Sequence, residues 1–459
     1  MSCFSVLRRA LNLFAVGVLQ LLSSVANAEP VTVSVDKEQQ KYQMRINGKP
    51  FTVKGVGLSY RSDDQIRALK KAGGNAYRTW GVHSLDHELA LARELGLMIA
   101  VGLATGKQLQ GFDYDDEAAV AKQYVEMTAI IDKYKDHPNV LCWVIANEPN
   151  LFMDEQGNMA RPNPGVYDAL GQITDYIHKV DPHHPVTIAF AGAHKDAIET
   201  ALARIPQLDI VSVQLYGRLG GLAEMITSLD IDKPFMVTEF GPKGHWENPA
   251  TEWGREIEEP GAIKAQGMAA RMNKAILNDQ TGKVVGSFAF LWGQKQERTP
   301  TWYGMFNATG EQTARIDELT KIWTGSYPGN RAPLSYAITI NGQVPESSVY
   351  LKPRERARAK VVVSDPDGDE LTTRWLFMDE VRVRSQGGHH EDAPEEFPVN
   401  VLVTRQLQDG VEIEFTAPAH DGEYRLFSYS YDSHNHVANA NIPFKVGEKP
   451  VQKQVSAHN

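Results

Sequence analysis

The stretch Val140-Leu-Cys-Trp-Val-Ile-Ala146, followed at once by Asn147-Glu148-Pro149, is an uninterrupted apolar run that ends in an amide and a carboxylate. Its length and its β-branched and aromatic content are typical of a strand that is buried on both faces of a parallel sheet. A carboxylate directly after such a strand is rarely a simple surface group, because buried acids need a partner or a function. The run therefore predicts both a fold and a candidate site.

Seven more apolar runs of the same kind lie between residues 51 and 323. They are Phe51–Leu58, Asn75–Thr79, Leu97–Leu103, Val186–Phe190, Asp209–Leu215, Phe235–Thr238 and Gly286–Leu291. Between them, apolar residues recur every three or four positions, which predicts amphipathic helices. This pattern is found in Ser84–Leu95, Asp115–Lys135, Val166–Val180, Ile263–Leu277 and Gln312–Trp323. Eight strands, each with a following helix, predict an α/β fold, a (β/α)8 TIM barrel over residues 51–326.

The segments on either side of the predicted barrel have different patterns. Residues 29–50 alternate in polarity and contain the turn signal Asn47-Gly48, which predicts an N-terminal β-hairpin covering the bottom of the barrel. After Tyr327-Pro328-Gly329-Asn330 the helical period disappears, and short alternating runs predict an immunoglobulin-like β-sandwich over residues 327–449. Residues 450–459 are polar, and we expect them to form a disordered tail.

Residues 1–28 have the three parts of a secretory signal peptide. Arg8-Arg9 precedes an apolar run from Ala10 to Leu22, and Ala26-Asn27-Ala28 is a small-x-small cleavage site. We therefore expect an exported protein, periplasmic or secreted after cleavage. The apolar run is shorter than a membrane span of about 20 residues, so the mature chain is not expected to be integral to a membrane.

Composition narrows the classes of partner and cofactor. The 459 residues include 47 Lys and Arg against 57 Asp and Glu, a net charge of −10, which argues against nucleic acid or an anionic membrane. Of the two cysteines, Cys142 alone follows the signal segment, and its apolar neighbours favour a buried, inert thiol. No glycine-rich nucleotide fingerprint follows the first predicted strand, so we expect no organic cofactor.

Two polar segments of the predicted sandwich resemble metal sites. Asp365-Pro-Asp367-Gly-Asp369-Glu370 looks like a calcium loop, but it lacks the EF-hand spacing, and a turn is the preferred interpretation. Gly387-Gly-His389-His390-Glu391-Asp392 is interpreted as a solvated loop, because adjacent histidines face apart on most backbones. We therefore expect no metal.

The strand ends point to the chemistry, because reactive groups of a TIM barrel collect at the carboxyl ends of its strands. Glu148 follows the fourth predicted strand and Glu239 follows the seventh. Two carboxylates over one opening suit cleavage of a glycosidic bond: one protonates the leaving oxygen, and the other attacks or stabilises the anomeric carbon. The alternative is a structural ion pair with Arg78, which ends the second strand and is able to keep one acid charged.

These residues carry a resemblance to a known group of enzymes. His137-Pro-Asn-Val-Leu-Cys-Trp-Val-Ile-Ala-Asn147-Glu148-Pro149 resembles the acid/base segment of clan A glycoside hydrolases, most of all the family 2 barrel domain. Asp232-Lys-Pro-Phe-Met-Val-Thr-Glu239-Phe-Gly241 resembles their nucleophile segment, and Asn75–Thr79 and Asp181–Thr187 match the second-strand and fifth-strand pieces. The resemblance implies a retaining double displacement with Glu148 as acid/base and Glu239 as nucleophile.

The resemblance also implies roles for the residues around the two acids. Arg78 and Tyr216 orient Glu239, Asn147 binds the 2-hydroxyl of the sugar, and Trp292 is the platform beneath the sugar. An aromatic ring suits that last role, since the apolar face of a sugar packs on it. For Trp292 and Tyr216 the alternative is core packing.

Further residues on the predicted barrel loops are candidates for contact with the substrate. Trp80 and His83 follow the second strand. Additional aromatic residues follow strands seven and eight, and each is as consistent with packing as with a cleft for several sugar units: Trp246, Trp253, Trp302 and Tyr303. His245 is a further candidate for sugar contact.

The chain departs from the family pattern in two places. Gln214 stands where the family often has Asn, and the β-domains that usually precede a family 2 barrel are replaced by the short hairpin. A barrel with a downstream sandwich also resembles family 5 endo-β-glucanases and family 72 β-1,3-glucanosyltransferases. The sequence predicts a retaining β-glycosidase acting on a β-glucan or a related oligo- or polysaccharide. The alternatives are a transglycosylase with the same two acids and a non-catalytic polysaccharide-binding or scaffold protein. Linkage, endo or exo action and oligomeric state stay open.

Overall fold

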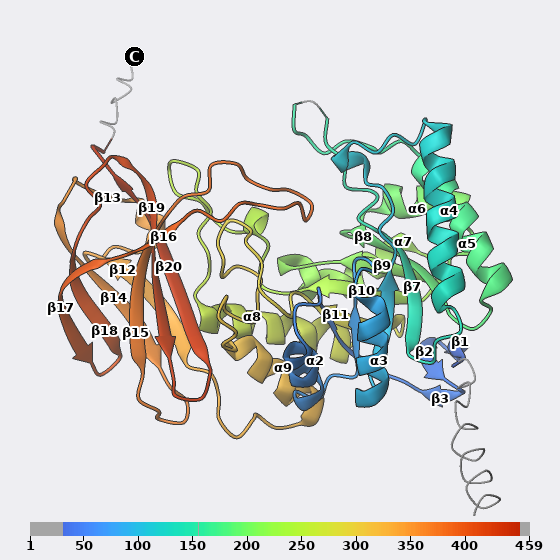
Figure 1. Ribbon diagram of the computed structural model, residues 1–459, viewed down its shortest axis with the longest axis horizontal. Coiled ribbons are helices and arrows are strands. Elements are labelled where there is room, and N and C mark those ends of the chain that lie inside the picture. The colour runs from blue at the N-terminus through green and yellow to red at the C-terminus, as the bar shows by residue number, and fades with distance from the viewer. Residues whose placement is uncertain (1–30, 155, 450–459) are drawn as a thin grey trace, which may run out of the picture.

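The computed structural model describes residues 31–154 and 156–449, and its larger part is a closed barrel of parallel strands (Figure 1). The strands neighbour one another in the order β10-β11-β4-β5-β6-β7-β8-β9, and β9 also pairs with β10, which closes the ring. The strands are β4 (Val53–Gly57), β5 (Ala76–Arg78), β6 (Met98–Gly102), β7 (Val140–Asn147), β8 (Val186–Ala191), β9 (Ile210–Gln214), β10 (Phe235–Phe240) and β11 (Val284–Ala289). The predicted TIM barrel is confirmed.

Helices on the outside of the barrel follow the strands. They are α2 (Asp63–Lys71), α3 (Leu85–Leu95), α4 (Glu117–Tyr134), α5 (Gly165–Val180), α6 (Lys195–Arg204), α7 (Leu222–Leu229), α8 (Gly261–Met272) and α9 (Ala314–Thr324). Local chemistry sets their ends: the Asp116 carboxylate accepts from the backbone N–H groups of Ala118 and Ala119 at the start of α4, and α3 ends at Gly96 with φ 64°. Short helical turns η1 (Gln108–Gln110), η2 (Gly217–Gly221) and η3 (His245–Glu247) lie in the loops, and η4 (Asn273–Leu277) directly continues α8.

The N-terminal segment covers the amino ends of the barrel strands. It forms β1 (Val33–Glu38), β2 (Lys41–Ile46) and the short β3 (Lys49–Pro50), and the buried Val33 and Met44 belong to one apolar cluster with residues that begin the barrel strands. The Asn47-Gly48 turn, with φ 49° and 75°, joins β2 to β3. The turn of the β1–β2 hairpin itself is at Gln39-Gln40, which the sequence pattern did not indicate.

The C-terminal part consists of two sheets that share one apolar core. Its strands are β12 (Leu334–Ile340), β13 (Val349–Leu351), β14 (Arg356–Ser364), β15 (Thr372–Asp379), β16 (Glu396–Pro398), β17 (Asn400–Leu407), β18 (Gly410–Thr416), β19 (Gly422–Tyr431) and β20 (Val437–Val446). One sheet has the order β12-β14-β18-β17 and the other β13-β20-β19-β15-β16. Val361 and Phe415 of the first sheet pack in one cluster with Phe377 and Phe444 of the second, so the part is a β-sandwich.

The barrel and the sandwich meet along a buried polar seam, which we define as Glu258, Lys264, Thr299, Thr301 and Asn441. Lys264 lies on α8, which packs between the barrel and strands β12 and β20 (Figure 1). The Glu258 carboxylate accepts from the Lys264 ammonium, both threonine hydroxyls and the Asn441 amide of β20, the last at 2.6 Å. Both charged side chains belong to the barrel part and are 1% exposed, and the Asn441 amide joins their buried ion pair to the sandwich.

Several sequence predictions fall outside the structural description. The predicted signal peptide, residues 1–28, and the predicted tail, residues 450–459, lie outside the described residues. Among the described residues, no helix has both the length and the apolar character needed to cross a membrane. Cys142 is buried as predicted, and burial raises the pKa of its thiol to about 12, so it stays a protonated thiol.

Candidate active site

A cavity of about 1350 Å³ opens where the barrel strands end. It is lined by Asn147 and Glu148 at the end of β7, by Gln214 at the end of β9 and by Glu239 on β10. The barrel topology accounts for this convergence, because the carboxyl ends of all eight strands face the same opening. The cavity is larger than the roughly 300–1,000 Å³ usual for a small-molecule site, which suits an oligosaccharide.

Glu239 accepts hydrogen bonds from four side chains, and its own side chain is only 7% exposed. Its Oε1 atom accepts from Arg78 Nη1 at 3.2 Å, Trp80 Nε1 at 3.0 Å and Gln214 Nε2 at 3.0 Å, and its Oε2 atom accepts from the Tyr216 hydroxyl at 2.8 Å. A group that accepts every contact it makes behaves as an ionised carboxylate. The donors therefore fix its orientation and stabilise its negative charge.

Asn147 is oriented by the same network. Its Oδ1 atom accepts from Arg78 Nη2 at 2.8 Å and from Gln214 Nε2 at 2.7 Å. Both bonds use the carbonyl end of the amide, which leaves the Nδ2 donor for a ligand in the cavity. Arg78 is fully buried, and burial lowers the pKa of its guanidinium, so it needs the two acceptors that Glu239 and Asn147 supply.

Glu148 differs from Glu239 in its environment. It has φ 55°, in the left-handed region, and its backbone N–H donates to Ala189 O at 2.7 Å. Loss of solvation in the cavity and, secondly, the negative charge of Glu239 raise the pKa of Glu148 to about 7. Near neutral pH the cavity therefore holds one carboxyl that is still partly protonated and one carboxyl group that is surrounded by donors, the division of roles that acid-assisted glycoside cleavage requires.

The structure brings most of the predicted site residues to this cavity. Trp80 and Tyr216 both line it, and they contact different oxygens of the Glu239 carboxylate. Trp292 is among the lining residues, but its side chain has no exposed surface and its indole N–H donates to Gln65 O at 2.8 Å. The stacking role stays a prediction, and the burial matches the core-packing alternative.

Other predicted residues lie elsewhere. His83 is exposed and is not among the cavity-lining residues, because the loop after β5 turns outward into α3 at this point. Trp302 is fully buried with its indole N–H on Lys243 O, and Trp253 packs on Tyr350 of the sandwich. Of the additional aromatic residues, Trp246 and Tyr303 line the cavity, and so does His245.

Sequence reasoning missed charged residues that also line the cavity. Lys107 follows β6, and Lys295 and Glu297 lie on the loop after β11. Glu297 accepts from Lys295 Nζ at 2.5 Å and lies 3.5 Å from His245 Nε2, and these cations hold the pKa of Glu297 below its usual value although burial alone raises it. A strand-end search finds none of them, because they come from the middle of long loops. Gln214 stands out in the sequence only as a departure from the family pattern, yet it bridges Asn147 and Glu239.

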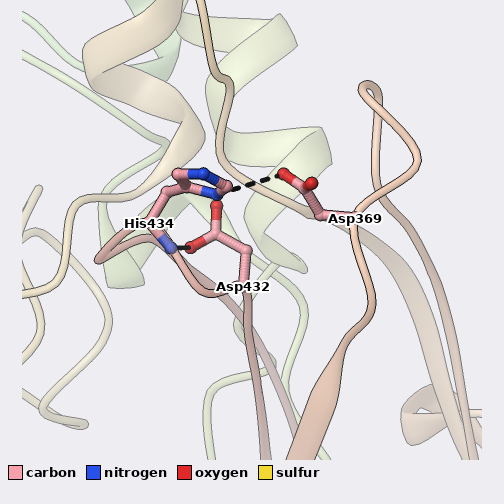
Figure 2. A group of neighbouring side chains, drawn as sticks. All are labelled: Asp369, Asp432 and His434. Atoms are coloured by element: carbon pink, nitrogen blue, oxygen red, sulfur yellow. Dashed lines mark hydrogen bonds and ion pairs between the residues drawn. The ribbon is translucent and has the colours of Figure 1, made fainter.

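Away from the cavity, three side chains of the sandwich meet near its junction with α9. Figure 2 shows Asp369, Asp432 and His434 pointing toward one another, with ligand-type atoms within 4.8 Å of one another. Asp432 accepts from the backbone N–H of His434, and Asp369 accepts from the Asn330 amide at 2.6 Å and lies 3.3 Å from His434 Nδ1. These partners tie residue 330, in the connection to the barrel, to two sandwich loops. We interpret the group as a structural junction.

The family comparison agrees with this geometry. A profile described as "Glycosyl hydrolases family 2, TIM barrel domain" matches residues 37–245, which include Arg78, Glu148, Tyr216 and Glu239. The barrel is similar to the glycoside hydrolase domains of family 2. The resemblance inferred from the sequence motifs is thereby confirmed.

Similar curated proteins have two different activities in their names. The chain is 27% identical over 164 residues to a β-glucuronidase of Paenibacillus borealis, covering 31% of this chain and 26% of that protein. It is 38% identical over 212 residues to a probable mannan endo-1,4-β-mannosidase C of Aspergillus terreus, covering 32% of this chain and 52% of that protein. The chain thus spans between a quarter and about half of these relatives' lengths.

Solved structures support the fold. A β-glucuronidase 2 of Bacteroides uniformis, covalently bound to cyclophellitol-6-carboxylate aziridine, aligns with a TM-score of 0.50 at 13% identity, covering 91% of this chain and 48% of that one. A β-glucuronidase of Ruminococcus gnavus also aligns with a TM-score of 0.50, at 16% identity, covering 64% of this chain and 53% of that one. At these identities the likeness shows the fold alone.

Proposed function

We propose that this protein is a retaining β-glycosidase in which Glu239 is the nucleophile and Glu148 is the acid/base. One observation carries the proposal: four donors converge on the Glu239 carboxylate, while Glu148, in the same cavity, has its pKa raised to about 7. An attacking group that is charged and a neighbouring group that still holds a proton are the two components of double displacement.

The mechanism follows from this division. Glu239 attacks the anomeric carbon while Glu148 gives its proton to the leaving oxygen, and a covalent glycosyl ester forms. Esterification removes the negative charge of Glu239, and with it the second-largest cause of the raised pKa of Glu148. Glu148 then loses its proton more readily and is ready to accept one from water. Asn147 Nδ2, presented by the Arg78–Gln214 contacts, is the donor for a sugar hydroxyl.

The proposed substrate is a β-linked oligo- or polysaccharide, a β-glucan or a related glycan. The size of the cavity supports more than one sugar unit. The relatives named as β-glucuronidases and as a probable mannan endo-1,4-β-mannosidase are compatible with β-glycosides of different sugars. A panel of linkage-defined oligosaccharides identifies the sugar and the linkage, and product length separates hydrolysis, which gives only shorter chains, from transfer, which gives longer ones.

The test of the two acids uses Glu239→Gln and Glu148→Gln on the glycoside that the panel identifies. Glu239→Gln is expected to lower turnover by a factor of at least about 1,000, since no nucleophile remains. On an aryl glycoside of the same sugar, whose leaving group departs without a proton, Glu148→Gln is expected to regain turnover with azide, which needs no deprotonation, and to give a β-glycosyl azide of retained configuration by proton NMR. Glu126→Gln, on the exposed face of α4, is the matched control.

Two results contradict the proposal. If Glu239→Gln turns over glycoside as the parent does, the nucleophile assignment is wrong, and the polysaccharide-binding or scaffold alternative gains. If the first-formed product has inverted configuration, the enzyme is not retaining.

Two further proposals rest on the sequence pattern. The sandwich is proposed to be immunoglobulin-like, which fits its two largely antiparallel sheets. The protein is proposed to be exported, because residues 1–28 have the parts of a signal peptide. Mass spectrometry of the chain from the periplasm of a bacterial host is expected to show Glu29 as the first residue, and an intact Met1 there contradicts the export proposal.

A further inference from the structure

The loop between β15 and β16, residues 380–395, reaches from the sandwich to the mouth of the barrel. Figure 1 shows this part of the sandwich extending toward the barrel, and its residues Gln386, Gly387 and Gly388 line the cavity. Gly387 has φ 57°, and a Cβ atom placed on it comes within 2.6 Å of Leu109 Cδ2 and 2.9 Å of Leu151 Cδ2. A larger side chain at this position therefore has to displace both leucines, so the loop packs closely against the barrel here.

A buried charge pair fixes this loop to the barrel. The Glu391 side chain has no exposed surface, and its Oε1 accepts from the Arg298 backbone N–H at 2.6 Å and from Gln296 Nε2 at 3.2 Å. Its Oε2 accepts from Arg298 Nη1 at 2.9 Å and from the Ser385 N–H at 2.8 Å, while Arg298 Nη1 also donates to Ser385 O at 2.9 Å. Both ends of residues 385–391 are thus bound to one barrel arginine, and the segment is held as a closed clamp. We call residues 385–391 the rim clamp.

The rim clamp contacts a lysine of the barrel that lines the same cavity as the acid/base. Lys107 Nζ donates to Gly387 O at 3.3 Å, and Lys107 is half-buried among the cavity-lining residues, as is Glu148. Among the charges that act on Glu148, Lys107 is the first that lowers its pKa, against burial and Glu239, which raise it. The hydrogen bond to the Gly387 carbonyl fixes the position of the Lys107 ammonium.

We propose that the rim clamp is a wall of the glycan cleft and that its Gly387 carbonyl positions Lys107 beside Glu148, on the side of the cleft where the leaving group lies. The assignment of the side rests on the proposed function, because the acid/base is the group that protonates the leaving oxygen. The sandwich is accordingly part of the catalytic unit. Lys107 is a positioning residue that acts through Glu148, and the clamp selects for leaving groups that are sugars over small ones.

The first test is the pH profile of kcat/KM in the full-length enzyme. Lys107→Gln removes a positive charge, so the pKa of Glu148 rises and the alkaline limb is expected to move up by about 0.5–1 pH unit. Lys107→Arg keeps the charge, and its limb is expected to stay with that of the parent. Lys122→Gln, a lysine with a 78% exposed side chain on α4, is the control for loss of charge. A lower kcat at every pH with an unmoved limb in Lys107→Gln overturns the positioning role.

The second test uses two glycines that differ in one respect. Gly387 and Gly388 have φ 57° and 81°, but a Cβ atom on Gly388 meets nothing within 4 Å. Alanine strains the backbone at both positions, and only at Gly387 does it also collide with the barrel. Gly387→Ala is expected to shift the alkaline limb in the direction of Lys107→Gln and to raise KM at least about threefold more for an oligosaccharide than for an aryl glycoside. In Gly388→Ala the limb is expected to stay in place.

The outcomes separate this proposal from the proposed function. If Glu239→Gln keeps the parent's turnover, the proposed function fails and the rim assignment fails with it. If Glu239→Gln is inactive but the limbs of Lys107→Gln and Gly387→Ala stay in place, only the rim assignment is overturned. The rim assignment is likewise overturned if Gly387→Ala and Gly388→Ala change the limb and the two KM values alike.

Discussion

Replacing Glu258 by alanine is expected to cost roughly 3–5 kcal/mol of unfolding free energy, because it leaves the Lys264 ammonium buried without its counter-charge. Lys264 is 1% exposed and keeps only Thr301 O at 2.6 Å and Asn439 Oδ1 at 3.4 Å as other acceptors. Burial lowers the pKa of Lys264 to about 8, and Glu258 partly opposes this. The loss is a large part of the 5–15 kcal/mol that usually separates folded from unfolded states.

The double replacement Glu258→Leu with Lys264→Met provides the matched comparison. It removes both charges and fills the space with apolar groups, so its cost is expected to stay within about 1 kcal/mol. Asp86→Ala breaks the exposed pair between Asp86 and Lys133, whose side chains are 71% and 55% exposed, and is expected to leave stability unchanged within error. A double variant that costs less than Glu258→Ala alone shows that each buried charge is tolerated only with the other present.

Urea unfolding followed by tryptophan fluorescence measures these differences at equilibrium. The parent is expected to unfold in one transition, since the seam couples the barrel to the sandwich, and Glu258→Ala is expected to lower the midpoint and to separate two transitions. A midpoint for Glu258→Ala within error of that for Asp86→Ala would refute the reasoning. A double variant that loses as much as the single one would refute it as well.

Three other predictions concern ionisable groups. Because Glu148 must hold a proton to act as an acid and its pKa is about 7, kcat/KM is expected to fall with a midpoint near pH 7 on the alkaline side, and a midpoint below pH 5 in a pH–rate profile contradicts the assignment. Tyr216→Phe removes the 2.8 Å bond to Glu239, a charge-assisted bond of about 1.5–3 kcal/mol, so single-turnover rates are expected to fall roughly 10- to 150-fold, and an unchanged rate contradicts the orienting role. Burial raises the pKa of Glu88 from 4.5 to about 7, above its unfolded value, so stability falls as pH rises from about 4.5 to 7. Glu88→Gln is expected to be up to about 3 kcal/mol more stable than the parent at pH 8 and equal to it near pH 4.5, and equal unfolding midpoints at pH 8 contradict the charge penalty.

The barrel is predicted well from the sequence because each of its strands is marked by its own short apolar run. Each predicted apolar run contains a strand within a few residues of its bounds, since a strand buried on both faces needs a continuous apolar stretch. Glu148 and Glu239 are found for the same reason: strand ends are marked in the sequence, and the topology brings them together. The helices α2, α6 and α7 were not delimited, because they are short and carry few buried positions.

The contacts between barrel and sandwich are out of reach of such patterns. Lys107 and Gly387 are 280 positions apart, and neither segment has a sequence pattern that predicts contact with the other. The sequence around His389 and His390 favours a solvated loop, and the His390 side chain is indeed 87% exposed. Its neighbour Glu391 is fully buried against Arg298. Alternation of polarity describes a strand, but it does not describe a loop that is held by one arginine of another domain.

The rim clamp and the seam bear on how this architecture is inherited and engineered. Accessory domains of carbohydrate-active proteins are commonly treated as independent units that can be exchanged. The connection near residue 327 is the obvious position for such an exchange. In this chain such an exchange removes Glu391 from the buried Arg298 and the Asn441 amide from the buried Glu258, and it opens the cleft at the same time. A chimera joined at that position is therefore expected to lose stability and activity. The hairpin of residues 33–46 lies at the opposite end of the barrel from the cleft, and we expect it to tolerate inserted sequence better.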